Sequence, residues 1–407
     1  MKKDKASRHY AYVIIAIITI IGCDYGFNYW LRYYSSIYVV GLAEKTHERS
    51  PEWSPDGKYI AYLCGFSYPS DGWDIRSWNN PGWGLRTSEI CIIELDTRQI
   101  RQITRFGRDK YGLKWSPNGN YLLWIDGRKN LISIYDFENG KTLVNINRDT
   151  YDCLPIFWSQ DSQRLLSSCG NFTLELPTMK ISKSPSTTET TDMLLSPNEE
   201  YLAHLKEFSF TGDVPLPALQ KYHEIFGANS NPYLMTIIQN GVSIYKSDYW
   251  VINHDHPHPF EWSPDGDILV FRKYVEDFEE PDIVFLYAPT GETALFESDE
   301  FYSLYWSPNG NKIACKTNED TLEIVEFEFR INPFSYIVTN RQSLSLNKSS
   351  EGDRFGEDLV WSPDEKHIAY SYYQFKENFN EAIISFPPKI WLVNLETGTQ
   401  TPLVVEP

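Results

Sequence analysis

One five-residue phrase recurs along the chain between short runs of alternating apolar and polar positions. Trp-Ser-Pro-Asp-Gly begins at Trp53 and returns, with variations, at spacings of 37 to 67 residues. Pro suits the first corner of a tight turn, Asp or Asn suits the second, and Gly allows the positive φ at which the chain leaves it. Each copy is therefore predicted to join two strands as a hairpin. The seven copies begin at Trp53, Trp115, Trp158, Leu195, Trp262, Trp306 and Trp361.

A second hairpin is predicted downstream of each phrase. Further apolar runs carry turn signals such as Asn139-Gly140 and Thr397-Gly398 at their tips, and in the fourth repeat this hairpin is predicted over residues 242–253. Two hairpins make four strands per repeat, and four-stranded units bury both faces of their sheets when they stack in a ring. The sequence thus predicts an all-β fold, a β-propeller of seven four-stranded blades.

Six or eight blades are alternatives to seven. Copies three and four depart from the phrase, because Gln160 stands in place of Pro and Leu195 in place of Trp. Residues 36–43 form one further candidate strand, which could join the last blade and latch the ring closed. An insertion over residues 65–88, rich in Gly and Pro, interrupts the first repeat and is predicted to be a loop.

The repeats resemble those of the TolB-type β-propeller family, whose Trp-Ser-Pro-Asp-Gly phrase also occurs in propellers of prolyl-oligopeptidase-type enzymes. The resemblance covers about residues 45–404 and rests on all seven copies. It implies a propeller, and it implies a periplasmic protein that acts as a partner in envelope complexes. Residues 24–44 are too few for a separate amino-terminal domain of the TolB kind, so a role in that translocation system does not follow.

The amino terminus has the pattern of a targeting signal. Residues 11–22 form an apolar run that follows Lys2, Lys3, Lys5 and Arg8, and the run is shorter than the ~20 residues of a membrane span. Ile20-Ile21-Gly22-Cys23 resembles a bacterial lipobox, which implies cleavage before Cys23 and its lipidation. We therefore expect a signal peptide at 1–22, a lipid-anchored tether with the latch strand at 23–44, and the propeller at 45–407.

Two alternatives exist for this terminus, an uncleaved signal anchor and a plain signal peptide. All three interpretations place the body of the protein outside the cytoplasm, in the periplasm or at the cell surface. The lipoprotein interpretation adds a membrane anchor.

Charge and missing motifs narrow the function. The chain has 37 Lys and Arg against 55 Asp and Glu, a net charge of −18, whereas nucleic-acid binders show a basic face. It has no Gly-x-Ser-x-Gly elbow, phosphate-binding Gly loop or His-Glu-x-x-His. We expect a non-catalytic scaffold that binds an envelope protein or peptide segment and no nucleic acid. The alternative is a carbohydrate-binding protein, or a metal-dependent polysaccharide-active enzyme, with its site at the channel mouth.

One mouth of the channel is a candidate binding site. The residue six positions before each Trp, or before Leu195, should lie where the first strand of a blade enters the channel. Four of these seven residues are carboxylates and two are histidines, and like charges around a low-dielectric channel favour a divalent metal ion or a Lys/Arg-rich partner segment. They are His47, Asp109, Asp152, Glu189, His256, Glu300 and Phe355.

Two local clusters offer other chemistry. His254, His256 and His258 alternate, so on one extended strand they would share a face and could hold a divalent metal ion, although neighbouring prolines favour a solvated loop. No other cofactor is expected. The 65–88 insertion carries three tryptophans, which are either aromatic anchors for a protein or sugar or a lid over their own blade. They are Trp73, Trp78 and Trp83.

Five cysteines remain after Cys23, and an oxidising compartment permits them to pair. Pairing Trp158 with Arg164 across the third hairpin would place Cys153 opposite Cys169, which predicts a disulfide there. Cys64 and Cys91 lie on neighbouring strands of the first repeat and form a second candidate pair without a fixed register. Buried free thiols are the alternative.

Overall fold

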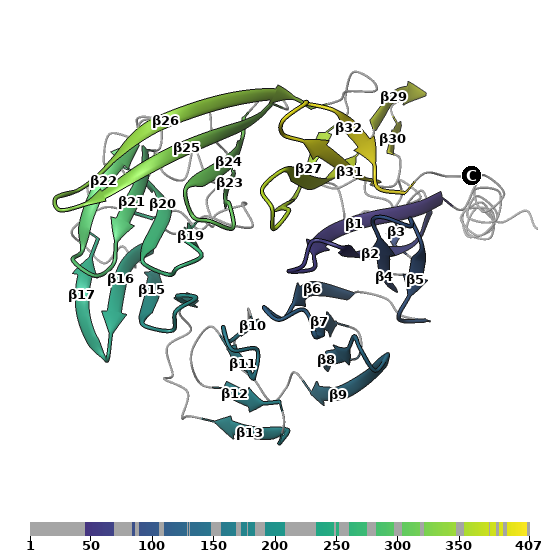
Figure 1. The fold of residues 1–407 in the computed structure, drawn as a ribbon, viewed down its shortest axis with the longest axis horizontal. Coiled ribbons are helices and arrows are strands. Elements are labelled where there is room, and N and C mark those ends of the chain that lie inside the picture. The colour runs from purple at the N-terminus through teal and green to yellow at the C-terminus, as the bar shows by residue number, and fades with distance from the viewer. Residues whose placement is uncertain are drawn as a thin grey trace, which may run out of the picture.

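Seven four-stranded antiparallel blades stand in a ring in the computed structural model (Figure 1). All of its described elements are strands, so the prediction of a seven-bladed all-β propeller is confirmed and the six- and eight-bladed alternatives are wrong. The structure describes residues 45–68, 84–85, 89–105, 110–127, 129, 131–147, 156–167, 172–176, 178–183, 192–207, 233–247, 250–251, 260–274, 282–296, 303–317, 321–346, 354–373, 375–379, 382–385 and 389–404.

Each blade is made from one continuous stretch of chain, with its first strand nearest the centre of the ring (Figure 1). Blade 1 has β1 (Lys45–Trp53), β2 (Tyr59–Tyr68), β4 (Glu89–Glu94) and β5 (Ile100–Gln102). Blade 2 has β6 (Lys110–Trp115), β7 (Tyr121–Asp126), β8 (Leu131–Asp136) and β9 (Lys141–Asn147). Blade 3 has β10 (Ile156–Trp158), β11 (Arg164–Ser167), β12 (Phe172–Glu175) and β13 (Lys180–Lys183).

The remaining blades follow the same order. Blade 4 has β14 (Asp192–Leu195), β15 (Tyr201–Glu207), β16 (Tyr233–Gln239) and β17 (Val242–Lys246). Blade 5 has β19 (Phe260–Trp262), β20 (Ile268–Tyr274), β21 (Asp282–Tyr287) and β22 (Glu292–Phe296). Blade 6 has β23 (Ser303–Trp306), β24 (Lys312–Lys316), β25 (Thr321–Ile331) and β26 (Phe334–Ser345). Blade 7 has β27 (Arg354–Trp361), β28 (His367–Tyr373), β31 (Lys389–Asn394) and β32 (Gln400–Pro402).

The repeated phrase is the turn between the first and second strands of every blade. The first strand ends at the Trp, or at Leu195, and the second strand begins six positions later. The Ser of the phrase is buried in all seven copies, and its Oγ accepts a hydrogen bond from the backbone N–H of the residue that opens the second strand. In blade 1, Tyr59 N donates to Ser54 Oγ at 2.9 Å, and Ser54 Oγ donates to Asp56 Oδ1 at 2.6 Å. A buried hydroxyl therefore holds each turn from inside.

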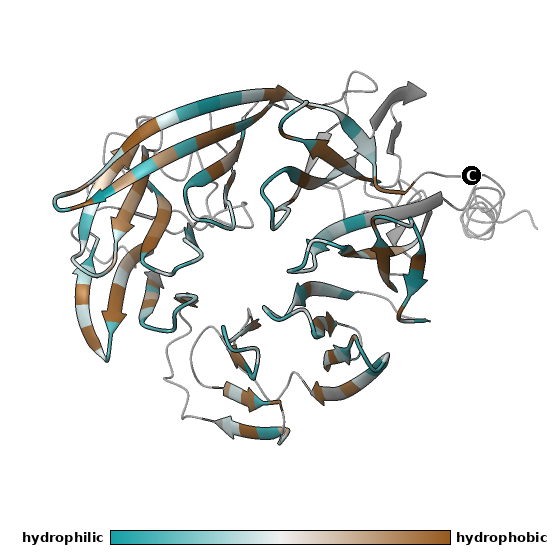
Figure 2. Ribbon diagram, in the orientation of Figure 1, coloured by the Kyte–Doolittle hydropathy of each residue, from teal (hydrophilic) through white to brown (hydrophobic). Residues whose placement is uncertain are grey.

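The core lies between blades. Apolar side chains gather on the middle strands of each blade, while the turns are hydrophilic (Figure 2). Six clusters of buried side chains each join two neighbouring blades. Among the described residues, no such cluster joins blade 3 to blade 4. There the structure shows an ion pair instead, between Arg164 Nη2 and Glu199 Oε2 at 3.0 Å.

Within the described residues, the first and last blades of the ring are joined by side-chain packing. Ile60 and Tyr62 of blade 1 pack against Ile390 of β31 and against Leu403, which directly follows β32. The Arg98 guanidinium also crosses this seam and donates from Nη1 to the Leu403 carbonyl at 3.1 Å. Blade 7 takes all four strands from the carboxyl-terminal part of the chain. The predicted latch strand at 36–43 lies outside the described residues.

Three segments differ from their predicted structure. The 65–88 insertion is not all loop, because β2 runs on to Tyr68 and pairs with β3 (Gly84–Leu85). The second hairpin of blade 4 was predicted one strand too late: it is β16 and β17, which turn at Asn240-Gly241. β18 (Trp250–Val251) instead pairs with both β16 and β20, which joins blades 4 and 5 into one sheet. In blade 7, β29 (Phe375–Phe379) and β30 (Ala382–Ser385) form a separate hairpin.

Candidate functional site

The tryptophan of the phrase ties each blade to the one before it. In five blades its indole Nε1–H donates to the backbone carbonyl of the residue that precedes the equivalent position in the previous blade, at 3.0 to 3.3 Å. The pairs are Trp115 with Glu52, Trp158 with Lys114, Trp262 with Leu194, Trp306 with Glu261 and Trp361 with Tyr305. The phrase thus fixes the spacing of the inner strands around the channel as well as forming a turn.

Two blades lack this tie. Blade 4 has Leu195, whose side chain has no N–H to donate, at the joint where the apolar cluster is also absent from the described residues. In blade 1 the buried Nε1 of Trp53 has no hydrogen-bond partner. Trp53 faces blade 7 across the closing seam, where its ring centroid lies 6.4 Å from that of His367. This joint therefore lacks the indole hydrogen bond that the other five tryptophans make.

The residue before the tryptophan, or before Leu195, lines a shared cavity in most blades. Five of these seven residues line one cavity of about 800 Å³ at the turn end of the channel. They are Glu52, Lys114, Glu261, Tyr305 and Val360. Exposed or half-buried prolines from four turns form the rim of this cavity, and they are Pro55, Pro117, Pro308 and Pro363. We call this space the turn-end cavity.

Bulges in the inner strands aim the first two of these side chains. The ladder of β1 and β2 shifts between Arg49 and Glu52, and that of β6 and β7 shifts between Tyr111 and Lys114. A positive φ marks each bulge, at Ser50 and at Gly112. Bulges bend a strand and redirect the side chains that follow. Both charged residues therefore come directly after a bulge that turns them toward the turn-end cavity.

Glu52 and Lys114 neutralise each other across two blades. Lys114 Nζ lies 3.2 Å from Glu52 Oε2. Burial raises the pKa of Glu52, and Lys114 opposes that shift through its charge and hydrogen bond. Glu52 is largely buried, whereas the Lys114 side chain is more than half exposed to the cavity. The pair contributes no net charge to the cavity wall.

Glu261 is the third charged residue in the described wall of the turn-end cavity. Its Oε2 accepts a hydrogen bond from Trp306 N at 3.0 Å, while its own carbonyl receives the Trp306 indole. Burial raises the pKa of Glu261 to about 7, and the Trp306 amide and the charge of Lys114 only partly offset the effect. Near neutral pH this carboxyl is therefore about half protonated, and a nearby cation would shift it to the ionised form.

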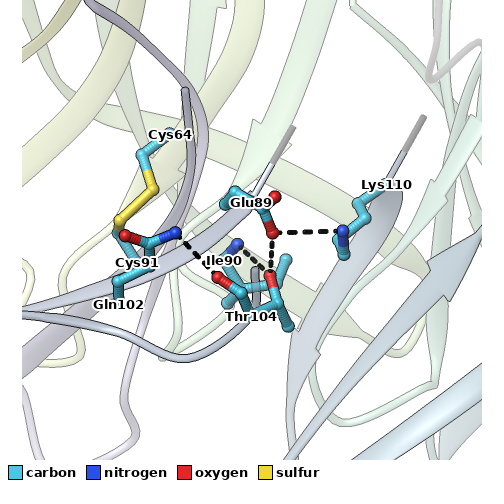
Figure 3. Close-up of a disulfide and its surroundings, with 7 residues drawn as sticks. All are labelled: Cys64, Glu89, Ile90, Cys91, Gln102, Thr104 and Lys110. Atoms are coloured by element: carbon cyan, nitrogen blue, oxygen red, sulfur yellow. Dashed lines mark hydrogen bonds and ion pairs between the residues drawn. A yellow bond between two sulfur atoms is a disulfide. The ribbon is translucent and has the colours of Figure 1, made fainter. Parts of the chain in front are cut away.

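The other end of blade 1 carries a buried ion pair and a disulfide (Figure 3). Lys110 Nζ lies 3.3 Å from Glu89 Oε2, which also accepts a hydrogen bond from Thr104 Oγ1 at 2.6 Å. Both charged side chains are almost fully buried, and they join blade 2 to blade 1. Cys64 and Cys91 are bonded, with a Cα–Cα distance of 5.8 Å, so this candidate pair is confirmed.

The register behind the other proposed disulfide was wrong. Trp158 lies opposite Leu165 and not Arg164, because Ser159 N donates to the Arg164 carbonyl and the first strand therefore pairs one residue further along the chain than predicted. Cys153 and Cys169 themselves lie outside the described residues, so their pairing stays a prediction. Cys315 is a buried free thiol, and burial raises its pKa.

Most residues predicted for the opposite mouth lie outside the part of the chain that the structure describes. This holds for Asp109, Asp152, Glu189, His256 and Glu300, and for His254 and His258 of the histidine cluster. It also holds for Cys23 and for Trp73, Trp78 and Trp83. His47 and Phe355 lie in β1 and β27, opposite Gly65 and Tyr372. The metal, lipid and aromatic-anchor predictions are therefore neither confirmed nor contradicted.

Sequence reasoning missed the position before the tryptophan. Comparing the seven copies at that position would have found it, because Trp and Ser recur while the preceding residue changes from Glu to Lys to Phe to Leu. Within the described ranges no group of three or more His, Cys, Asp or Glu side chains is placed to hold a metal ion. The same ranges contain no helix of the length and hydropathy needed to cross a bilayer.

Comparison with known proteins supports the fold. No family model and no curated protein matches the sequence. Among solved structures, the β-propeller domain of the Trilobed protease from Pyrococcus furiosus, which has an open velcro topology, is similar with a TM-score of 0.54 and 10% identity over 89% of this chain and 99% of that one. A chain of the mitotic checkpoint complex matches with a TM-score of 0.46 and 14% identity, over 80% and 87% of the two chains. The chain is a seven-bladed β-propeller.

Proposed function

We propose that this protein is a non-catalytic scaffold that binds a protein or peptide segment in its channel, outside the cytoplasm and tethered to a membrane. The observation that carries the proposal is the turn-end cavity. It is bounded by five blades, lined by prolines and aromatic residues, and supplied with three charged side chains. Clefts of this size, mainly apolar with a few placed polar groups, are typical ligand sites.

The location rests on separate observations. The resemblance of residues 20–23 to a lipobox and of the repeats to TolB-type propellers favours an envelope protein. The Cys64–Cys91 disulfide supports this, because disulfides persist in oxidising compartments and are rare in the cytosol. The net charge of −18 argues against nucleic acid as a partner.

Photo-crosslinking tests the scaffold role. We would replace Pro308, on the rim of the turn-end cavity, with p-benzoylphenylalanine and irradiate the native membranes. The matched control places the same residue at Val242, which is 63% exposed on the outer strand of blade 4. Discrete adducts from the Pro308 position alone support the proposal. Equal adducts from both positions, or none from Pro308, would contradict it, and metal analysis of the pure protein would test the metal-dependent alternative.

A Cys23→Ser variant tests the membrane tether. We expect it to lose cleavage before residue 23 and its diacylglycerol, and to leave the lipid-anchored fraction. Mass spectrometry of the native protein gives an independent measurement. A native chain that still begins with Met1 would contradict the lipid anchor and support an uncleaved signal anchor.

A further inference from the structure

The described wall of the turn-end cavity contains two carboxyl groups and one ammonium group. Glu52 and Lys114 form an ion pair, which leaves Glu261 as the third charged residue of the described cavity wall. The structure gives its carboxylate one hydrogen bond, from the Trp306 amide. A carboxylate can accept several hydrogen bonds, so Glu261 retains the capacity to bind a donor that enters the cavity.

The surroundings of Glu261 select the kind of donor. A divalent metal ion needs several oxygen or nitrogen ligands, and this part of the described wall offers one carboxylate that is not already paired. An ammonium or guanidinium group needs only one carboxylate for a charge-assisted hydrogen bond. Tyr305 and Trp306 line the same wall, and both side chains are almost fully buried in the cores that join blade 6 to its neighbours.

We propose that the turn-end cavity binds a partner's extended segment through one Lys or Arg side chain, held by Glu261 between apolar residues. The inference rests on the proposed scaffold function and names its recognition chemistry. It assigns recognition to the end of the channel opposite the mouth predicted from the sequence. The prolines of the rim and Val360 offer apolar surface to the residues that flank the cation. A cavity of about 800 Å³ has room for a short segment rather than a folded domain.

Binding by this route depends on pH. The titratable side chains of the described wall are Glu52, Lys114, Glu261 and Tyr305, and the pKa of Glu261 is about 7 in the empty cavity. Glu261 is then about a tenth ionised at pH 6 and about nine-tenths ionised at pH 8. Since a cation binds the ionised form, its affinity should rise about tenfold between these two pH values. Lysine stays protonated throughout that range.

Titration with two blocked peptides tests the proposal on the full-length protein. The probes are Ac-Gly-Leu-Lys-Leu-Gly-NH2 and the same peptide with norleucine in place of lysine. The binding of each is measured by calorimetry at pH 6 and pH 8. We expect the lysine peptide to bind at least tenfold more tightly than the norleucine peptide at pH 8. We also expect the lysine peptide to lose about tenfold in affinity at pH 6. No measurable binding of the lysine peptide, or equal affinity for both peptides, would overturn the proposal.

Two variants assign the effect to one residue. Glu261→Gln should abolish both the preference for lysine and its pH dependence. Glu138→Gln removes the same charge from an exposed turn outside the cavity and should keep both. If Glu261→Gln does not fold, the wild-type comparison of the two peptides at the two pH values still decides the question. Retention of the lysine preference in a folded Glu261→Gln variant would contradict the inference.

The peptide experiment and the crosslinking experiment can fail separately. If adducts form from the Pro308 position but the lysine preference is absent, the scaffold role stands and the cationic recognition through Glu261 is wrong. If adducts are absent, the scaffold proposal itself is wrong.

Discussion

The fifth residue of the repeated phrase takes a positive φ in every blade. Four copies have Gly there, whereas blades 3, 4 and 7 have Ser162, Glu199 and Glu365 at φ of 59°, 63° and 56°. These three side chains accept hydrogen bonds from the preceding blade, from Asn118 N, Arg164 and Asn309 N. Glu365 also holds Lys312 Nζ at 2.8 Å. Where the phrase lacks Gly, the substituted side chain therefore adds a bond between blades that offsets an unfavourable backbone conformation.

Gly266 and Gly241 form a matched pair for measuring this constraint. Both have a positive φ, but a Cβ at Gly266 would lie 2.6 Å from Asn198, whereas a Cβ at Gly241 meets nothing within 4 Å. We expect Gly241→Ala to destabilise the fold by about 1 kcal/mol and Gly266→Ala by about 2 to 4 kcal/mol. Denaturant unfolding measures both. Equal losses would mean that the turn of blade 4 moves aside at little cost.

The tryptophan tie can be tested in the same way. Trp361 Nε1 donates to the Tyr305 carbonyl at 3.0 Å, whereas Trp53 Nε1 is buried without a partner. Replacing either ring with Phe removes similar apolar volume, but only Trp361→Phe breaks a hydrogen bond. We therefore expect Trp361→Phe to lower the free energy of unfolding by about 1 to 2 kcal/mol more than Trp53→Phe does. A larger loss at Trp53 would show that its N–H is bonded in solution.

At the scale of elements, the hairpins followed from local chemistry and the register did not. The buried Ser, its i+5 hydrogen bond and the positive φ lie within one short turn, so the end of one strand and the start of the next could be predicted in all seven blades. The one-residue register error in blade 3 arose because the closing pair is Ser159 with Arg164. The strand β16 was not predicted. It begins at Tyr233, 26 residues after β15 ends at Glu207, whereas the second strand of a blade usually leads into the third after a short turn.

The disulfide of blade 1 joins two adjacent strands on either side of an insertion. Its sequence separation of 27 residues predicts that removing it destabilises the protein by about 3.5 kcal/mol. We expect a Cys64→Ala, Cys91→Ala double variant to show this loss, and reductant to produce a similar loss in the wild type. Thiol counting on the denatured, unreduced mature chain gives a second measurement.

Three free thiols are expected if Cys64–Cys91 is the one bridge and Cys23 is lipidated. A count of one free thiol would show that Cys153 and Cys169 are bonded as well, as the sequence predicts. Five would contradict the Cys64–Cys91 bond itself.

At the scale of the whole molecule, stability depends on closing the ring. Leu403 is fully buried in the cluster that joins blade 7 to blade 1, while its carbonyl receives Arg98. We expect Leu403→Ala to destabilise the protein by about 2 to 5 kcal/mol. The control is Ile100→Ala in the outer strand of blade 1, where the side chain is 48% exposed and the loss should stay below about 1 kcal/mol. A small effect at Leu403 would mean that the seam contributes little to holding the ring together.

Local hydrogen bonding within seven short phrases was enough to predict the all-β class, the seven blades and the strand ends on either side of each turn. The turn-end cavity required the ring, because its wall combines residues that lie far apart in the sequence. Glu52 forms an ion pair with Lys114 of the next blade, whereas the carboxylate of Glu261 in blade 5 accepts a hydrogen bond from the Trp306 amide of blade 6. A sequence segment as short as one turn cannot show this difference. Opposite charges on separate blades meet only after apolar packing has set the distance and angle between the blades. For the same physical reason, the packing of blade 1 against blade 7 at the seam was decided by the tertiary structure alone.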